Sequence, residues 1–343
     1  MAYTKTKRGS IEFWKKVIMM AELTMVEAIR LAIEEEMTKN EKIIILGEDI
    51  GVNGGVFRTT DGLIDKFGSK RVLDTPLNES GIVGFAIGLA LRGLRPIAEI
   101  QFSDFVWPAF DQIISELAKF RYRSGGQFVS PVVVRMPYGA GVRGAHYHSQ
   151  SAESIFTHIA GLKVVVPSSP YDAKGLLISA LRDPDPVMFF EPKRIYRAFR
   201  EDVPEGDYTV PIGEAKIVKE GKDVTILSYG AVLHTALSAA ELAENQNIDV
   251  EVIDLRSLVP LDIETIEQSV KKTGRVISVT EGPKTSGFHS ELNALVAERY
   301  IEYMEAPILR VTGYDIPIPL VNEEHYLPSK ERILDAIIKS YNF

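Results

Sequence analysis

Cysteine is missing from all 343 residues of this chain. Its absence excludes disulfides, thiolate metal sites and a cysteine nucleophile, and it agrees with a reducing compartment such as the cytoplasm. No apolar run reaches the roughly 18 residues that indicate a membrane-spanning helix. Basic residues form no long run either, and 39 Lys and Arg against 47 Asp and Glu give a net charge of -8. We therefore expect neither a nucleic acid nor a membrane as a partner.

The remaining composition, with 45% hydrophobic and 25% charged residues, is that of an ordinary globular protein with room for two domains. Apolar runs of strand length alternate with amphipathic helical segments, which predicts an α/β fold with two doubly wound domains and parallel sheets. From 191 to 213 this periodicity disappears, and prolines interrupt a charged segment. We therefore predict an extension, a first domain, a linker and a second domain, at residues 1–21, 22–200, 201–213 and 214–343.

Individual elements follow from caps and periodicity. Thr24 and Glu27 form a capping box that opens the first helix, and an apolar run at 43–46 indicates a strand buried on both faces. Glu48 and Asp49 directly follow this strand, where α/β folds bind ligands, although a solvated loop acid is the commoner case. Further strands are expected at 97–102, 132–135, 162–166, 187–190, 224–228, 250–253, 275–280 and 309–311. Further helices are expected at 108–122, 169–181, 231–244, 262–272, 287–301 and 329–341.

The stretch 74–81 carries the strongest functional signal. Pro76 and Asn78 disfavour a helix, whereas apolar residues from Ile82 onward recur at helical spacing, so Glu79 falls where a loop becomes a helix. The helix N-terminus favours a carboxylate by roughly 0.3–1 kcal/mol, while full burial raises a carboxyl pKa by up to about 3–5 units. A buried Glu79 would therefore hold a proton near neutral pH and share it with a ring nitrogen. The alternative is a solvated glutamate that caps its own helix.

Glycines mark one side of the helix that Glu79 begins. Gly81, Gly84 and Gly88 lie three and four residues apart, so they leave a strip without side chains. Each glycine costs a helix roughly 0.5–1 kcal/mol relative to alanine. This cost indicates that another structure packs very close to the strip.

The loop 139–144 matches the pattern G-x-G-x-x-G and follows a strand. Its continuation is Ala-His-Tyr-His, where a nicotinamide-nucleotide site would have an apolar helix, so the context disfavours that site. The continuation holds His146 and His148, and an imidazole in such a place moves protons or holds a carboxylate substrate. A zinc pair would need further ligands, of which the nearest acid is Glu153. A structural or solvent-facing histidine is the other alternative.

Several stretches together resemble the β subunit of the thiamine-diphosphate-dependent 2-oxo acid dehydrogenases. They are residues 74–84, 99–102, 120–125, 148–151, 161–167, 172–176, 249–256, 272–275 and 306–311. The similarity runs from about residue 22 to the C-terminus. It implies a pyrimidine-binding domain followed by a transketolase C-terminal-like domain, and assembly with an α subunit into an α2β2 heterotetramer.

The resemblance assigns roles to individual residues. Glu79 would be the acid that hydrogen-bonds the pyrimidine ring nitrogen of thiamine diphosphate and thereby activates the cofactor as a nucleophile. Leu77 and Phe105 would contact the cofactor, with Phe105 replacing the tyrosine of some relatives. His148 would assist proton and acyl transfers, and Gln101 would border the substrate pocket. The implied reaction is oxidative decarboxylation of a 2-oxo acid, with acyl transfer to a lipoyl group on a dihydrolipoyl acyltransferase core.

The resemblance also implies two metal ions. Thiamine enzymes hold the diphosphate through Mg²⁺ bound by a Gly-Asp-Gly motif, which this sequence lacks, so the α subunit would supply the Mg²⁺ ligands. The cofactor would then lie at the subunit interface. Some relatives hold a structural K⁺, whose ligands here would be Val132, Val133, Ala180, Asp183 and Asp185. Asp185 replaces an asparagine of some relatives.

The function remains open within this resemblance. The segments 147–153 and 100–104 favour a branched-chain 2-oxo acid, with pyruvate or acetoin dehydrogenase as alternatives. The C-terminal half of a split transketolase would share both domains but not the 74–84 motif in this form. A non-catalytic binding module would dock a partner through Phe288, Tyr300 and Tyr303, although apolar helix positions are more typical of a core.

Overall fold

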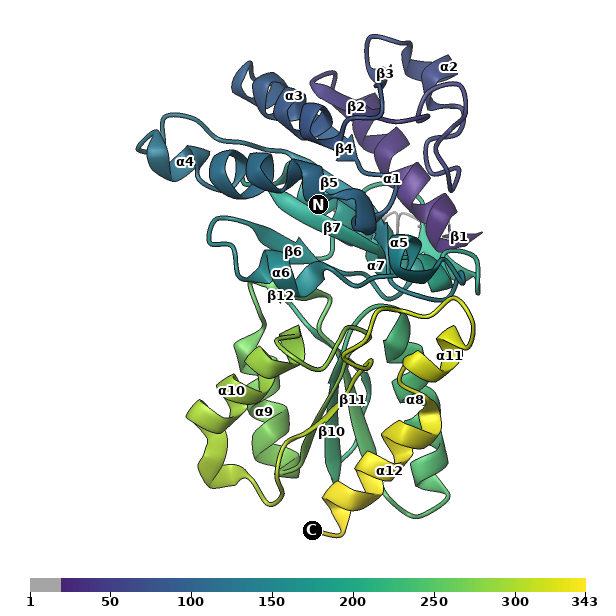
Figure 1. Ribbon diagram of the computed structural model, residues 1–343, viewed down its shortest axis with the longest axis vertical. Helices are drawn as coiled ribbons and strands as arrows, with labels where there is room; N and C mark the ends of the chain where they lie inside the picture. Colours follow the sequence, from purple (N-terminus) through teal and green to yellow (C-terminus); the bar gives the residue numbers. More distant parts are fainter. Residues whose placement is uncertain (1–19) are drawn as a thin grey trace, which may run out of the picture.

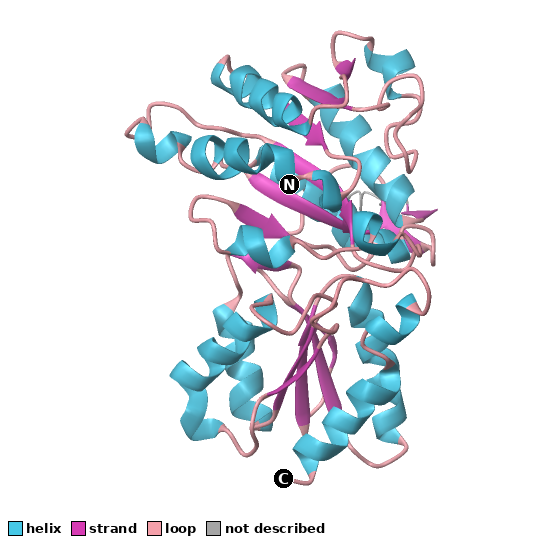
Figure 2. Cartoon of the chain, viewed as in Figure 1, coloured by secondary structure: helices cyan, strands magenta, loops and turns pink. Residues whose placement is uncertain are grey.

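A computed structural model describes residues 20–343, in which two α/β domains follow one another along the chain (Figure 1). Most of the expected extension lies outside the described residues, and its last two residues begin strand β1 (Met20–Leu23). Strands form the centre of each domain and helices lie outside them (Figure 2). Within the described part of the chain, no helix has the length and apolar character needed to cross a membrane.

The first domain is built on a seven-stranded sheet in the order β12-β6-β7-β5-β4-β2-β3. Its strands are β2 (Ile43–Gly47), β3 (Val72–Asp74), β4 (Arg95–Glu99), β5 (Val133–Tyr138), β6 (Lys163–Val165), β7 (Val187–Pro192) and β12 (Ser257–Val259). All neighbours pair in parallel except β12 with β6. β12 comes from the chain beyond the expected linker, so the second domain supplies the last strand of this sheet.

Helices cover both faces of the sheet, which confirms the doubly wound arrangement. Side chains alternate along the strands, so that Ile45 joins the core under α1 (Met25–Lys39) and α7 (Pro170–Arg182), whereas Leu46 joins the core under α3 (Glu79–Leu91). The other short elements are α2 (Leu63–Phe67), η1 (Ser103–Phe105), η2 (Trp107–Ala109), η3 (Gln112–Leu117), α4 (Phe120–Arg123), α5 (Ala145–His148), α6 (Glu153–Thr157) and η4 (Lys193–Ile195).

The helix expected at 108–122 is interrupted. Its centre, η3, is a π-helix, in which the amide of Ala118 bonds the carbonyl of Ile113 at 2.9 Å. This i to i+5 spacing inserts an extra residue into the turn, which an apolar pattern does not predict.

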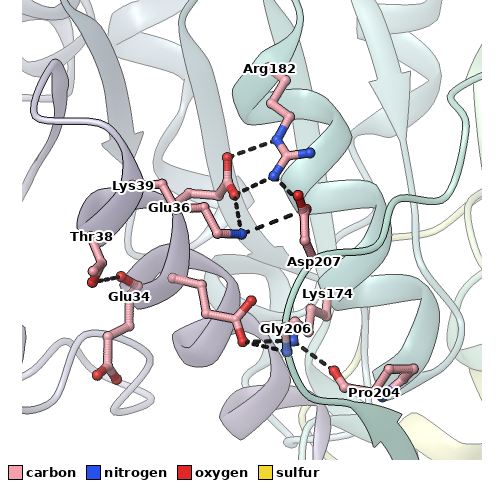
Figure 3. Close-up of polar contacts among 10 residues, drawn as sticks. Glu34, Glu36, Thr38, Lys39, Lys174, Arg182, Pro204, Gly206 and Asp207 are labelled. Atoms are coloured by element: carbon pink, nitrogen blue, oxygen red, sulfur yellow. Dashed lines mark hydrogen bonds and ion pairs between the residues drawn. The ribbon is translucent and has the colours of Figure 1, made fainter. Parts of the chain in front are cut away.

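Residues 201–213, expected as a linker, pack on the first domain. β8 (Glu201–Pro204) pairs antiparallel with β1. Beyond it, Asp207 accepts a hydrogen bond from Arg182 at 2.6 Å, and the same arginine bonds Glu36 of α1 at 2.6 Å (Figure 3). Lys174 of α7, which is buried, donates to the carbonyl of Pro204 at 2.8 Å. The periodicity stops here because a short edge strand and side-chain ion pairs hold this segment.

The second domain has a five-stranded sheet in the order β14-β13-β10-β11-β9, in which β9 is the antiparallel edge. The strands are β9 (Lys216–Lys219), β10 (Val224–Ser228), β11 (Val250–Asp254), β13 (Val276–Val279) and β14 (Leu309–Val311). The helices are α8 (Ala231–Glu244), α9 (Ile263–Thr273), α10 (Phe288–Tyr300), η5 (Ile301–Tyr303), α11 (Glu323–Tyr326) and α12 (Lys330–Tyr341). α8 and α12 cover one face, while α9 and α10 join the core that the two domains share.

A buried ion cluster crosses the centre of the first sheet. Arg135 of β5 bonds both carboxylate oxygens of Glu191 in β7 at 2.7 Å and also bonds Glu99 in β4. The hydroxyl of Tyr196 donates to Glu191 as well. Because the two carboxylates hold its positive charge, the pKa of Arg135 is raised despite burial. Burial raises the pKa of Glu99, and the negative charge of Glu191 raises it further.

Candidate active site

The expected site residues converge on one edge of the first sheet. Parallel strands point their carboxyl ends to the same edge, where α/β proteins bind ligands. Glu48 follows β2, Glu79 follows β3, Gln101 follows β4, and the loop with His148 follows β5. These four strands are neighbours in the sheet, so the sequence-distant residues lie along one rim.

Glu79 is the first residue of α3, as expected. The cap of this helix is Asn78, whose side chain accepts a hydrogen bond from the amide of Gly81 at 2.9 Å. Because Asn78 fills the capping role, the carboxylate of Glu79 is not needed for it. Glu79 is half-buried, so the full burial considered from the sequence is not reached within this chain.

Glu48 forms an acidic pair with Glu79. Its Oε1 atom is buried and has no hydrogen-bond partner among residues 20–343. Burial raises the pKa of Glu48, and the nearby charges of Glu79 and Asp49 raise it further. Asp49 accepts a hydrogen bond from Gln101 at 3.5 Å, which joins the ends of β2 and β4. The sequence places Glu48 at a strand end, but it gives no sign that Glu79 lies beside it.

An aromatic cluster forms the other half of the rim. The ring of His148 stands edge-on to Phe102, with 4.6 Å between ring centroids, and to Phe105, with 5.2 Å. Phe57 extends the cluster, since its ring lies 5.5 Å from that of Phe102. Phe102 and Phe57 are additions to the residues expected from the sequence. They lie 45 positions apart in the sequence, so no local pattern indicates that they meet.

The rim beside Glu79 exposes apolar surface. Leu77 is 79% exposed and Phe85 is 54% exposed, and a cavity of about 400 Å³ lies between the 73–78 segment and α3. A Cβ atom built at Gly88 would meet no described atom within 4 Å outside its own helix, so the strip is open at Gly88. At Gly84 a Cβ atom would lie 3.3 Å from the side chain of Gln112, so this part of the strip is covered within the chain. Contiguous exposed apolar surface of this kind marks a site of contact with another protein or a ligand.

The residues proposed for K⁺ lie elsewhere. Val132 and Val133 stand at the start of β5, and Ala180 to Asp185 lead from α7 to the start of β7, so this group lies at the opposite edge from Glu79. Asp183 already pairs with Lys163 at 2.5 Å, and Asp185 pairs with Arg121 at 2.6 Å. Each of the two carboxylates is therefore already paired with a basic side chain of this chain.

The 139–144 loop does not lead into a nucleotide-binding helix. Only the four-residue helix α5 follows it, and the amide of Gly141 is occupied by the carboxylate of Glu323 at 2.9 Å. These facts rule out the dinucleotide motif. In the described residues, no group of three or more His, Asp or Glu side chains is placed to hold a metal ion, so His146 and His148 do not form a zinc centre with them.

The aromatic residues considered for docking divide between core and surface. Phe288 and Tyr300 are buried in the core shared by the two domains, whereas Tyr303 is 39% exposed. The core assignment therefore holds for the first two residues.

Comparisons with known proteins agree with this geometry. The family model of the transketolase pyrimidine-binding domain matches residues 21–198, and that of the transketolase C-terminal domain matches residues 213–333. A solved structure described as a split-gene transketolase, an inactive β4 tetramer, has a TM-score of 0.75 at 24% identity and covers 94% of this chain and 99% of its own. The class is therefore the transketolase-type proteins with two α/β domains, which use thiamine diphosphate.

Relatives with higher identity define the family within this class. The β subunit of mitochondrial 2-oxoisovalerate dehydrogenase from Dictyostelium discoideum is 53% identical over 93% of this chain and 86% of its own length. The pyruvate dehydrogenase E1 β subunit of Bacillus subtilis is 48% identical over 94% of this chain and 100% of its own length. This chain belongs to the family of β subunits of the 2-oxo acid dehydrogenase E1 component, as the sequence resemblance indicates.

Proposed function

We propose that this chain, joined with an α subunit in an α2β2 heterotetramer, catalyses the oxidative decarboxylation of a 2-oxo acid and passes the acyl group to lipoyl groups of a dihydrolipoyl acyltransferase core. The observation that carries the proposal is the open rim around Glu79. An acid pair, an aromatic cluster with a histidine, and the exposed apolar side chains of Leu77 and Phe85 lie there. The chain lacks the Gly-Asp-Gly motif, so the Mg²⁺ and the diphosphate end of the cofactor belong to the α subunit.

The residues of the rim fit the pyrimidine end of thiamine diphosphate. An aminopyrimidine is a flat ring with nitrogens that accept and donate hydrogen bonds, so it needs one acid and apolar walls. Glu79 supplies the acid, while Leu77 and Phe105 supply apolar surface. When bound, the cofactor supplies the carbon nucleophile of the reaction. Assembly with the α subunit would further cover Glu79, which is half-buried in this chain.

The remaining polar groups take part in proton transfer and substrate binding. Burial and the nearby charges of Glu79 and Asp49 raise the pKa of Glu48, so we assign Glu48 to the proton exchange at Glu79. His148 faces the reacting centre and assists proton and acyl transfer, since an imidazole both donates and accepts protons near neutral pH. Gln101, fixed by Asp49, borders the substrate.

We propose a branched-chain 2-oxo acid as the substrate, and pyruvate is the second candidate. Relatives named 2-oxoisovalerate dehydrogenase β subunits are 53% and 52% identical to this chain, and a pyruvate dehydrogenase relative from Acholeplasma laidlawii is 50% identical. The segments 147–153 and 100–104 favour the branched-chain acid. A cysteine-free sequence agrees with a cytoplasmic location.

A structural K⁺ is also proposed, at Asp183 and Asp185. The C-terminal end of α7 favours a cation there, and the ammonium group of Lys163 stands in for it at 2.5 Å from Asp183. K⁺ would take oxygens of Asp183 and Asp185 and the carbonyls of Val132, Val133 and Ala180. It would displace Lys163 from Asp183 and Arg121 from Asp185.

The test is reconstitution with an α subunit that carries Gly-Asp-Gly. The isolated chain is expected to bind thiamine diphosphate weakly and to decarboxylate no 2-oxo acid. The assembled subunits are expected to decarboxylate 3-methyl-2-oxobutanoate with a higher kcat/KM than pyruvate. Decarboxylation by the isolated chain would contradict the shared site, and a preference for pyruvate would replace the branched-chain assignment.

A further inference from the structure

A carboxylate from the second domain occupies the centre of the loop that carries His148. Oε2 of Glu323 accepts hydrogen bonds from the amides of Gly141, at 2.9 Å, and Arg143, at 3.0 Å. Its Oε1 accepts the hydroxyl hydrogen of Ser149 at 2.6 Å. Glu323 is the first residue of α11, about 180 positions away in sequence, and it is 3% exposed. One buried side chain therefore ties both ends of the loop to the second domain.

The loop backbone has the form of an anion-binding nest. Gly141 has a φ of 105°, Arg143 of 54° and Ala145 of 53°, all in the left-handed region. Left-handed residues in such a run turn successive amides toward one point, where they bind an anion. Residues other than glycine adopt this conformation at a cost and keep it when their surroundings hold them there. The carboxylate of Glu323 is the anion that holds this nest.

Two further carboxylates hold the loop ends. Oε1 of Glu281, in the second domain, accepts the amide of Ala140 at 2.6 Å. Oδ1 of Asp104 accepts the amide of Gln150 at 3.1 Å. The ammonium group of Lys193 balances these charges, since it is buried among Asp104, Glu281 and Glu323 and lies 5.5 Å over the ring of Phe102.

The same anchors fix the histidine. Ser149, which Glu323 binds, is the next residue after His148, and it accepts the amide of Gly144 at 3.1 Å on the other side of the histidine. The His148 ring is then held edge-on to Phe102 at 4.6 Å. The backbone on both sides of His148 is therefore fixed through one serine and one glutamate.

We propose that Glu323 is a positioning residue, through which the second domain holds the His148 loop in its active geometry. This inference rests on the role proposed above for His148. Glu323 does not touch the rim itself, so its effect passes through Gly141, Arg143 and Ser149. The second domain thereby has a direct part in the site of the first domain, besides supplying β12 to its sheet.

The experiment compares Glu323→Ala with the neighbouring Glu324→Ala in the assembled enzyme. Glu324 is exposed and serves as the matched control. Glu323→Ala is expected to increase amide hydrogen exchange in the 139–149 peptide at least tenfold and to lower kcat about 100-fold, since misplacing a catalytic group by about 1 Å costs that much. Glu324→Ala is expected to change neither. Glu323→Gln keeps an oxygen for the two amides and is expected to restore most of both.

The outcomes separate this inference from the proposed function. Unchanged exchange in the 139–149 peptide of Glu323→Ala would overturn the positioning role, whatever the activity. Faster exchange with unchanged kcat would also overturn it, because the loop would then not control catalysis. Failure of His148→Ala to alter any step would refute the role of His148 and leave the exchange result intact. If Glu323→Ala does not fold, Glu323→Asp, whose shorter side chain cannot reach both amides, is expected to give the same faster exchange.

Discussion

Replacing Arg135 by methionine tests how much the buried ion cluster contributes to the free energy of unfolding. The arginine is 0% exposed, and its loss leaves two carboxylates, Glu99 at 3% and Glu191 at 0% exposure, without their cation. Removing one partner of a buried ion pair costs about 3–5 kcal/mol. Because Arg135 serves two carboxylates and Tyr196 can donate to only one of them, we expect the upper part of this range.

The pH dependence of this loss is the sharper test. Without Arg135, the folded protein favours the protonated form of Glu99, whose pKa burial already raises above the value of about 4.3 in an unfolded chain. A raised folded-state pKa makes the extra loss small near pH 4 and lets it grow as the pH rises. Urea unfolding at pH 5 and pH 8 measures it, with Arg123→Met, in an exposed pair with Glu116, as the control. An equal loss at both pH values would refute the electrostatic explanation.

Three other predictions concern the buried Glu153, the exposed Gly88 and K⁺. Burial raises the pKa of Glu153 to about 7. Its contribution to stability is therefore full below pH 4.5 and falls as the pH rises through about 7. Glu153→Gln should reduce the pH dependence of the unfolding free energy between pH 5 and 8. Gly88→Leu should leave the isolated chain as stable or up to about 1 kcal/mol more stable, because a helix disfavours glycine, yet it should weaken α-subunit binding in sedimentation. KCl should raise the melting temperature above that in equal NaCl, and Asp183→Ala should abolish the difference.

Much of the fold was predictable because its signals are local. Continuous apolar runs such as 43–46 indicated the parallel strands, and capping residues placed the starts of α1 and α7 within a residue or two. β12 carries no such signal, since a three-residue strand on a different domain is defined by its pairing with β6. The same holds for β8, whose partner β1 lies about 180 residues away. Long-range pairing of short segments leaves no periodicity in the sequence.

The candidate site likewise combines residues that have a local sequence signal with residues that have none. Glu79 was predictable because a helix start and an acid coincide there, and the motif around it is specific to the family. Its neighbour Glu48 was noted only as an acid at a strand end, because the approach of the two carboxylates depends on β2 and β3 lying side by side. Glu323 gave no signal, since its role depends on the meeting of two domains and it begins a helix of only four residues.

The most direct test of the account is decarboxylation by Glu79→Gln assembled with the α subunit. The variant keeps the shape of the side chain but cannot exchange the proton, and general acid–base groups contribute about 10²–10⁴-fold to a rate. The account predicts that kcat for 2-oxo acid decarboxylation falls at least 100-fold, while heterotetramer assembly and the melting temperature stay near the parent values. A kcat within a few-fold of the parent, in a fully assembled enzyme, would contradict it.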